Sequence, residues 1–149
     1  MVRFKPREYN HATYKRHPTM ETVVTLRHRV LAVEDDADTL QLMRMVLSDL
    51  PLDIVHAGTG AEAIAFLKKE APELMFLDIN LPDMNGWDVL DCFKTDAARL
   101  SATRVVVLTS HSDPVHRLIG MLQPIAAYLN KPIAADKLRE RVRELLALP

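Results

Sequence analysis

The sequence predicts an α/β fold, in which helices cover both faces of a parallel β-sheet. Short apolar runs rich in branched residues alternate along the chain with segments whose apolar residues recur at helical spacing. The short runs stop abruptly at polar residues, as strands buried on both faces do. This alternation favours a parallel sheet whose strands are joined by right-handed crossover helices.

Five apolar runs are predicted to be the strands. They lie at residues 30–33, 53–57, 74–77, 104–108 and 127–130. Helices are predicted in the segments between them and after the last. Asp38 or Thr39 is expected to cap the first helix, and Thr59 with Glu62 three residues later matches the capping box of the second.

Two prolines delimit the fourth predicted helix. Pro114 suits its first turn, after a cap at Ser112 or Asp113. The helix must end before Pro124, because proline has no backbone N–H to donate.

Polar residues at the ends of four predicted strands indicate one shared site. Ligands of an open parallel sheet bind beyond the carboxyl ends of its strands, near the point where strand order reverses. Asp36 adjoins the first acidic pair, and either helix capping or metal binding fits it. The residues expected to converge are Glu34, Asp35, Asp78, Thr109 and Lys131.

These residue types predict phosphoryl transfer. Grouped carboxylates repel one another unless a cation joins them, and hard oxygen ligands in an open pocket suit Mg²⁺. A lysine ammonium and a hydroxyl supply the donors that phosphoryl oxygens require. Asp78 is then the predicted carboxylate nucleophile, and Lys131 would neutralise charge on the transferred group.

The same residues, in this order, resemble the receiver domains of bacterial response regulators. Those that carry the resemblance are Glu34-Asp35, Asp78, Thr109, Lys131-Pro132 and the loop 78–86. Spacings of 43, 31 and 22 residues separate Asp35, Asp78, Thr109 and Lys131. The resemblance covers residues 28–147. It implies a flavodoxin-like (βα)5 fold, a doubly wound five-stranded parallel sheet of order 2-1-3-4-5.

The resemblance implies a role for each of these residues. Asp78 would be the phosphoacceptor, and Lys131 and Thr109 would contact the phosphoryl group. The cofactor would be Mg²⁺. Asp35, Asp78 and the backbone carbonyl of Asn80 would bind the ion directly, and Glu34 would bind it through a water molecule.

Further roles implied by the resemblance concern switching and rate. Thr109 and Tyr128 would form the conformational switch, although a half-buried strand aromatic is the alternative for Tyr128. The side chains of Asn80 and His111 would tune the access of water to the acyl phosphate, although an exposed loop histidine is the alternative for His111. The Lys131–Pro132 peptide bond is expected to be cis.

Charge is distributed unevenly along the chain. Residues 1–29 contain seven Lys and Arg against two Glu, whereas the remainder is acidic. We expect residues 1–27 to be a basic, poorly ordered extension and residues 28–149 to be the receiver domain. A solvated tail fits this composition, and so does an arm that contacts nucleic acid or a membrane.

The expected location is the cytoplasm. No apolar run reaches the length of a membrane span, and no secretory signal is recognised at the N-terminus. Cys92 is the single cysteine, which fits a reducing compartment.

The predicted function is that of a single-domain response regulator without an output domain of its own. It would accept a phosphoryl group from a sensor histidine kinase or a histidine phosphotransfer protein, and would signal to a separate effector protein. We expect no enzymatic activity beyond its own phosphorylation and dephosphorylation.

The sequence suggests four alternatives to this function. One is a phosphorelay carrier without conformational output. Another is a nucleic-acid-binding regulator that uses the basic arm, although no helix-turn-helix or zinc motif supports it. A phosphatase is disfavoured, because Asn80 stands where a second acid would be expected. A receiver that is not phosphorylated is disfavoured because every acceptor-site position is filled.

Overall fold

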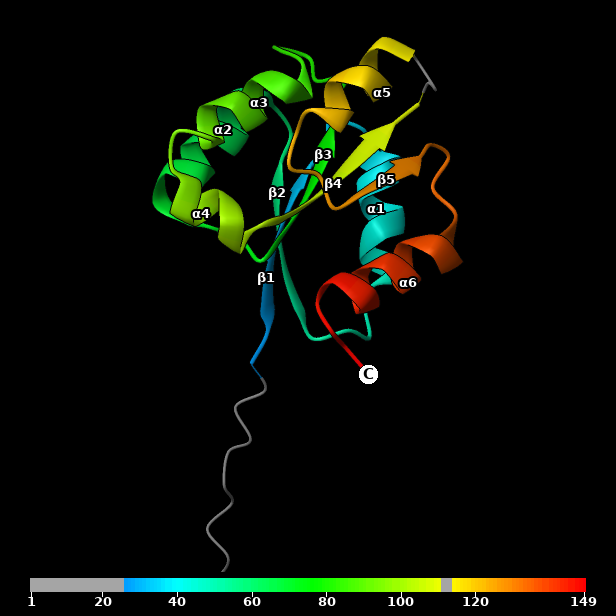
Figure 1. The fold of residues 1–149 in the computed structure, drawn as a ribbon. Helices are drawn as coiled ribbons and strands as arrows, with labels where there is room; N and C mark the ends of the chain where they lie inside the picture. The colour runs from blue at the N-terminus through cyan, green and yellow to red at the C-terminus, as the bar shows by residue number, and fades with distance from the viewer. Residues whose placement is uncertain (1–25, 111–113) are drawn as a thin grey trace, which may run out of the picture.

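The computed structural model describes residues 26–110 and 114–149. Its five strands are all parallel and follow the predicted order, β2-β1-β3-β4-β5 (Figure 1). The strands are β1 (His28–Val33), β2 (Leu52–Ala57), β3 (Leu74–Asp78), β4 (Arg104–Thr109) and β5 (Ala127–Asn130). Strand order reverses between β1 and β3, so the crevice of an open α/β sheet lies beyond the ends of these two strands.

Helices cover both faces of this sheet. α1 and α6 lie on one face, and α2, α3 and α4 lie on the other (Figure 1). The helices are α1 (Ala37–Val46), α2 (Gly60–Lys69), α3 (Gly86–Phe93), α4 (Ala97–Ala102), α5 (Pro114–Met121) and α6 (Ala135–Leu145).

Strand β1 shows how the sequence builds two cores. Val30 and Ala32 belong to the apolar cluster under α1 and α6, whereas Leu31 and Val33 belong to the cluster under α2 and α3. All four residues are fully buried. Burial on both faces is the reason why the strand reads as an unbroken apolar run rather than as an alternating one.

The predicted cap of the first helix was wrong. The residue at the N-cap is Asp36, whose side chain accepts hydrogen bonds from the Asp38 N–H at 3.3 Å and the Thr39 hydroxyl at 2.6 Å. β1 ends at Val33 and the helix begins at Ala37, so Asp38 and Thr39 already lie in its first turn.

The capping box of α2 was confirmed with one change. The Thr59 hydroxyl accepts from the Glu62 N–H at 3.1 Å, as predicted. The Glu62 carboxylate reaches back to the N–H of Gly58 at 2.9 Å, one residue earlier than in the usual box.

The short helix α4 was not predicted. It has six residues, which is too few to show a helical period, and Asp96 caps it by accepting from the Arg99 N–H at 3.2 Å. The described part of the chain therefore has one helix more than the (βα)5 pattern implies.

The proline expectations were confirmed. α5 begins at Pro114 and ends at Met121, before Pro124, and the Lys131–Pro132 peptide bond is cis. Ser112 and Asp113, the expected caps of α5, lie outside the described residues, as does most of the expected extension. Within the described ranges, no helix is long and apolar enough to cross a membrane.

Candidate functional site

Strand register brings the predicted residues to one edge of the sheet. Val33 of β1 pairs with Leu77 of β3, so the next residue along each strand, Glu34 and Asp78, lie side by side. Asp78 in turn pairs with Leu108 of β4, which places Thr109 one residue beyond. The chemistry-bearing residues share this edge because each directly follows a buried strand run.

Three carboxylates form an acidic cluster at this edge. One oxygen from each of Glu34, Asp35 and Asp78 lies within 4.8 Å of the others. Glu34 is fully buried and Asp78 is 3% exposed, whereas Asp35 is exposed. Two of the three charges therefore lack the solvation that water would give them.

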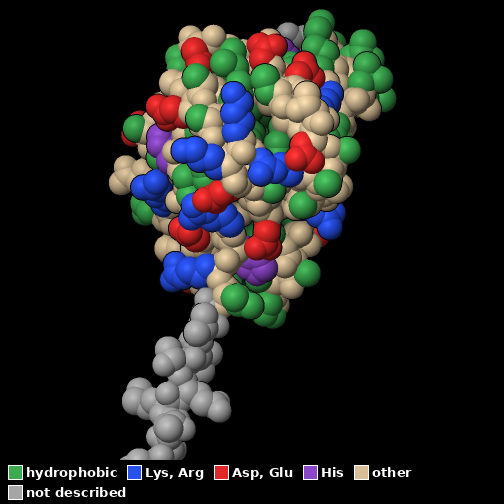
Figure 2. All heavy atoms as spheres, turned by 90° about the vertical axis from the view of Figure 1, so that its left-hand side faces the viewer, with side chains coloured by type: hydrophobic (Ala, Val, Ile, Leu, Met, Phe, Trp, Pro, Cys, Tyr) green, Lys and Arg blue, Asp and Glu red, His purple; other side chains and the backbone are tan. Residues whose placement is uncertain are grey.

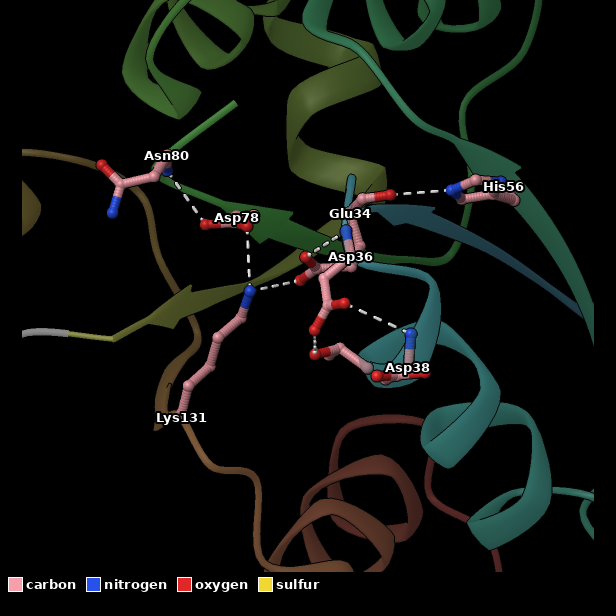
Figure 3. A network of polar contacts seen from close by, with 8 residues as sticks. Glu34, Asp36, Asp38, His56, Asp78, Asn80 and Lys131 are labelled. Carbon is pink, nitrogen blue, oxygen red and sulfur yellow. Dashed lines mark hydrogen bonds and ion pairs between the residues drawn. The ribbon is translucent and has the colours of Figure 1, made fainter. Parts of the chain in front are cut away.

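Lys131 links the two buried carboxylates. Its Nζ lies 2.7 Å from Oε2 of Glu34 and 2.9 Å from Oδ2 of Asp78 (Figure 3). Burial acts to lower the pKa of Lys131, but its contacts with the carboxylates of Glu34 and Asp78 outweigh that effect, and the pKa is raised. The ammonium therefore stays charged and offsets part of the carboxylate repulsion.

Burial raises the pKa of Glu34 to about 7, against the opposing effects of Lys131 and of the Asp36 N–H. That N–H donates to Oε1 at 3.0 Å. Oε2 is buried, and among the described residues none donates a hydrogen bond of adequate geometry to it, although the Lys131 ammonium lies 2.7 Å away. An oxygen of this kind, in an all-oxygen cluster, fits a hard cation such as Mg²⁺.

The backbone of Glu34 is also held in place. Nε2 of His56 donates to its carbonyl oxygen at 2.7 Å (Figure 3). His56 was not predicted to take part. The sequence feature that could have indicated this role is the position of His56 near the end of β2. That position is informative only once the strand order shows that β2 lies beside β1.

Asp36 lies outside the acidic cluster. Its hydrogen bonds to the Thr39 hydroxyl and the Asp38 N–H lower its pKa. Of the two roles that the sequence left open for Asp36, the geometry supports helix capping.

The remaining predicted residues surround the cluster at different depths. The N–H of Asn80 donates to Oδ1 of Asp78 at 2.9 Å, while its side chain is exposed. Thr109 is half-buried beside the site, and the N–H of Lys131 donates to its carbonyl at 2.8 Å.

Tyr128 is 40% exposed and its hydroxyl lies against Gly120 of α5 rather than in the site. His111 lies outside the described residues.

The family model of the response regulator receiver domain matches residues 30–143. The chain belongs to this family. Receiver domains are signalling modules of two-component systems; they generally bind Mg²⁺ and interact with histidine kinases and effectors. The acidic cluster of this receiver lies beyond the ends of β1 and β3, in the crevice where open α/β sheets bind ligands.

Curated relatives of this receiver are longer proteins. It is 34% identical over 122 residues to the DNA-binding response regulator MtrA of Mycobacterium tuberculosis, covering 82% of this chain and 52% of that protein. It is 36% identical over 114 residues to the regulatory protein LuxO of Vibrio vulnificus, covering 76% of this chain and 24% of that protein. The chain thus spans about half or less of these relatives.

Solved receiver domains share the fold over nearly their whole length. The signal receiver domain of a putative LuxO repressor protein from Vibrio parahaemolyticus has a TM-score of 0.74 and 37% identity, covering 82% of this chain and 92% of that one. A BeF3-activated DrrB receiver domain has a TM-score of 0.70 and 26% identity, covering 82% and 99%.

Proposed function

We propose that this receiver accepts a phosphoryl group on Asp78 in a reaction that requires Mg²⁺. The observation that carries the proposal is the pair of buried carboxylates, Glu34 and Asp78, linked by Lys131 at the ligand-binding edge of the sheet. One ammonium cannot neutralise three carboxylates, so a divalent cation would relieve the remaining repulsion.

The proposed direct Mg²⁺ ligands are the carboxylates of Asp35 and Asp78 and the backbone carbonyl of Asn80, with Glu34 acting through a water molecule. Support comes from the convergence of the three carboxylate oxygens within 4.8 Å. The bound ion would neutralise charge between Asp78 and the phosphoryl oxygens.

In the proposed step, a carboxylate oxygen of Asp78 forms a bond to phosphorus. The bond from phosphorus to the donor's leaving group breaks, and the leaving group keeps the electron pair. Lys131, now 2.9 Å from Asp78, would donate to a phosphoryl oxygen, and so would the Thr109 hydroxyl. Water would later hydrolyse the acyl phosphate at a rate tuned by the side chains of Asn80 and His111.

The proposed phosphoryl donors are a sensor histidine kinase or a histidine phosphotransfer protein. The proposed output surface is formed by α5, β5 and α6, where Tyr128 would follow the movement of Thr109. Support comes from a set of α5-side apolar residues that are 60–81% exposed: Val115, Leu118, Met121 and Leu122. Such an exposed apolar group suits docking of an effector protein.

Nucleic-acid binding gains little support from the face formed by α2, α3 and α4. The face of α2, α3 and α4 carries Lys and Arg interspersed with Asp and Glu rather than a continuous basic area (Figure 2). MtrA is named as DNA-binding, but this chain covers only 52% of that protein. We therefore propose a protein effector.

Intact-mass spectrometry tests the acceptor. We expect acetyl phosphate with Mg²⁺ to add one phosphoryl group, which hydroxylamine removes because it is an acyl phosphate. EDTA should prevent the addition. The control is Asp78→Asn, and equal labelling of this variant would refute the assignment to Asp78.

A further inference from the structure

The loop after Asp78 is closed at its base. The N–H of Gly86 donates to the carbonyl of Ile79 at 2.8 Å, and Asn80 and Asn85 form an antiparallel bridge. A Cβ atom on Gly86 would lie 2.4 Å from the carbonyl oxygen of Asp78, so only glycine allows this close approach. These contacts tie the ends of the loop 79–85 together but leave its tip to be held elsewhere.

The tip of the loop is held by the N-terminus of α2. Oδ1 of Asp83 accepts from the Gly60 N–H at 2.8 Å, and Oδ2 accepts from the Ala61 N–H at 2.9 Å. These two hydrogen bonds, Gly60 first, lower the pKa of Asp83. Asp83 is therefore an ionised, bidentate partner of a helix terminus that favours negative charge.

Packing reinforces the same attachment. Gly60 is buried, and a Cβ atom there would lie 2.4 Å from both Cγ and Sδ of Met84. Met84 thus sits directly against the backbone of α2, beside the hydrogen bonds of Asp83. Two consecutive loop residues contact the first turn of α2, one by charge and one by packing.

We infer that Asp83 is a positioning residue, which anchors the loop 79–85 on α2 and thereby holds Asn80 beside Asp78 for metal binding. The inference rests on the proposed function, in which the Asn80 carbonyl is a Mg²⁺ ligand. Mg²⁺ requires near-ideal octahedral geometry, so a small displacement of a backbone ligand weakens binding. The N–H of Asn80 also donates to Oδ1 of Asp78, so the same displacement would disturb the acceptor carboxylate.

If Asp83 only stabilised α2, its removal would have the same effect as removal of another cap of this helix, such as Thr59. Comparing the two residues therefore distinguishes a stabilising role from a positioning role. Both residues satisfy N–H groups in the first turn of α2, since Thr59 accepts from the Glu62 N–H at 3.1 Å. Thr59 belongs to the segment before α2 and is not part of the loop 79–85. Removing either side chain uncaps α2, but only removal of Asp83 frees the loop.

The experiment compares Asp83→Ala, Asp83→Asn and Thr59→Ala with the wild type. Mg²⁺ affinity is read from amide shifts of residues 78–80 during MgCl₂ titration, and stability from thermal unfolding in EDTA. We expect Asp83→Ala and Thr59→Ala both to lower the melting temperature. Only Asp83→Ala should weaken Mg²⁺ binding, by about tenfold, the lower end of the losses seen when an outer partner of a metal ligand is removed.

Asp83→Asn keeps one acceptor oxygen and should give an intermediate affinity for Mg²⁺. This variant also provides the test if Asp83→Ala does not fold. Wild-type affinity in both Asp83 variants would overturn the inference, and so would an equal loss in Thr59→Ala. A wild-type chain whose residues 78–80 do not respond to Mg²⁺ would instead refute the proposed function.

Discussion

Adjacent residues with the same side chain take different parts at this site. Asp35 contributes an oxygen to the acidic cluster, whereas Asp36 turns to the first turn of α1. Asp36 is the N-cap of α1, and its side chain accepts hydrogen bonds from the Asp38 N–H and the Thr39 hydroxyl, which holds it away from the cluster. Residue type alone could not distinguish the two carboxylates in the sequence, but the position at which α1 begins does.

Alanine substitutions should separate these roles. Asp35→Ala should weaken Mg²⁺ binding by more than about tenfold, because Asp35 is a proposed direct ligand rather than an outer partner. Asp36→Ala should leave Mg²⁺ affinity near that of the wild type but lower the melting temperature in EDTA, because α1 loses its cap. Mg²⁺ titration and thermal unfolding check the pair, and a larger loss of Mg²⁺ affinity in Asp36→Ala would reverse the assignment.

Gly120 provides the space that the exposed position of Tyr128 requires. A Cβ atom on Gly120 would lie 1.2 Å from the hydroxyl oxygen and 2.4 Å from Cζ of Tyr128. With Tyr128 present, Gly120→Ala should lower the free energy of unfolding by about 1–3 kcal/mol, as overpacking does. In a Tyr128→Ala background the same change should raise it by up to about 1 kcal/mol, because alanine favours a helix.

A double-mutant cycle in urea measures this change of sign. The same destabilisation in both backgrounds would mean that Tyr128 does not occupy the space beside Gly120. If the cycle shows the expected coupling, Gly120→Ala also becomes a means of displacing the Tyr128 ring from α5 without phosphorylation.

At the scale of elements, one ion pair ties the two helices on the same face of the sheet. Arg139 of α6 pairs with Asp49, just after α1, and also donates to the Val46 carbonyl at 3.2 Å. Arg139 lowers the pKa of Asp49 to about 2. A carboxyl whose pKa is depressed in the folded state stabilises it above the unfolded pKa, and this contribution is lost as the pH falls toward the folded pKa.

Asp49→Asn should therefore lower the melting temperature at pH 7, modestly because the pair is exposed. The difference from the wild type should shrink as the pH falls from about 5 to about 3, where Asp49 of the unfolded chain becomes protonated. Thermal unfolding across this range is the measurement. Glu144→Gln, which breaks the pair between Arg141 and Glu144 within α6, is a control that leaves the α1–α6 contact intact.

The sequence was sufficient to predict elements whose pattern is local. The central strands β1, β3 and β4 were found because burial on both faces leaves continuous apolar runs, as in β3, where every residue is buried, whereas the edge strands β2 and β5 are only partly buried. α4 was missed because six residues show no period. The anchoring of the loop by Asp83 was missed for another reason: its partners, Gly60 and Ala61, are more than 20 residues away in sequence. Such contacts depend on the packing of α2 against α3.

At the scale of the whole molecule, the proposed output surface contacts neighbouring elements through the sheet and through a helix pair. β4 pairs with β5, which aligns Thr109 with Asn130 and Val107 with Tyr128. On the helical side, Nε1 of Trp87 in α3 donates to Nδ1 of His116 in α5 at 3.0 Å. Trp87 is the single tryptophan of the chain, so its indole N–H is a unique reporter on the α3–α5 contact.

Beryllofluoride tests whether the two regions are coupled, because BeF₃⁻ bound to Asp78 stands in for the phosphoryl group. A switch requires a contact that differs between its two states, here the Thr109 hydroxyl meeting a fluorine in place of a phosphoryl oxygen. We expect BeF₃⁻ with Mg²⁺ to shift the amide of Asp78, the Trp87 indole N–H and the amide of Tyr128 together, with one midpoint.

Two variants distinguish the binding of BeF₃⁻ at Asp78 from the conformational change that it causes at Trp87 and Tyr128. Thr109→Ala should still bind BeF₃⁻ at Asp78 but give smaller shifts at Trp87 and Tyr128, because the contact that draws β4 toward the site is missing. Asp78→Asn should show none of the shifts. If the wild-type Asp78 amide responds while the Trp87 indole and Tyr128 do not, the phosphoryl group has no conformational effect on the α5–β5–α6 surface. The receiver would then act as a phosphoryl carrier, because transfer to another protein needs only the acceptor carboxylate and its cations.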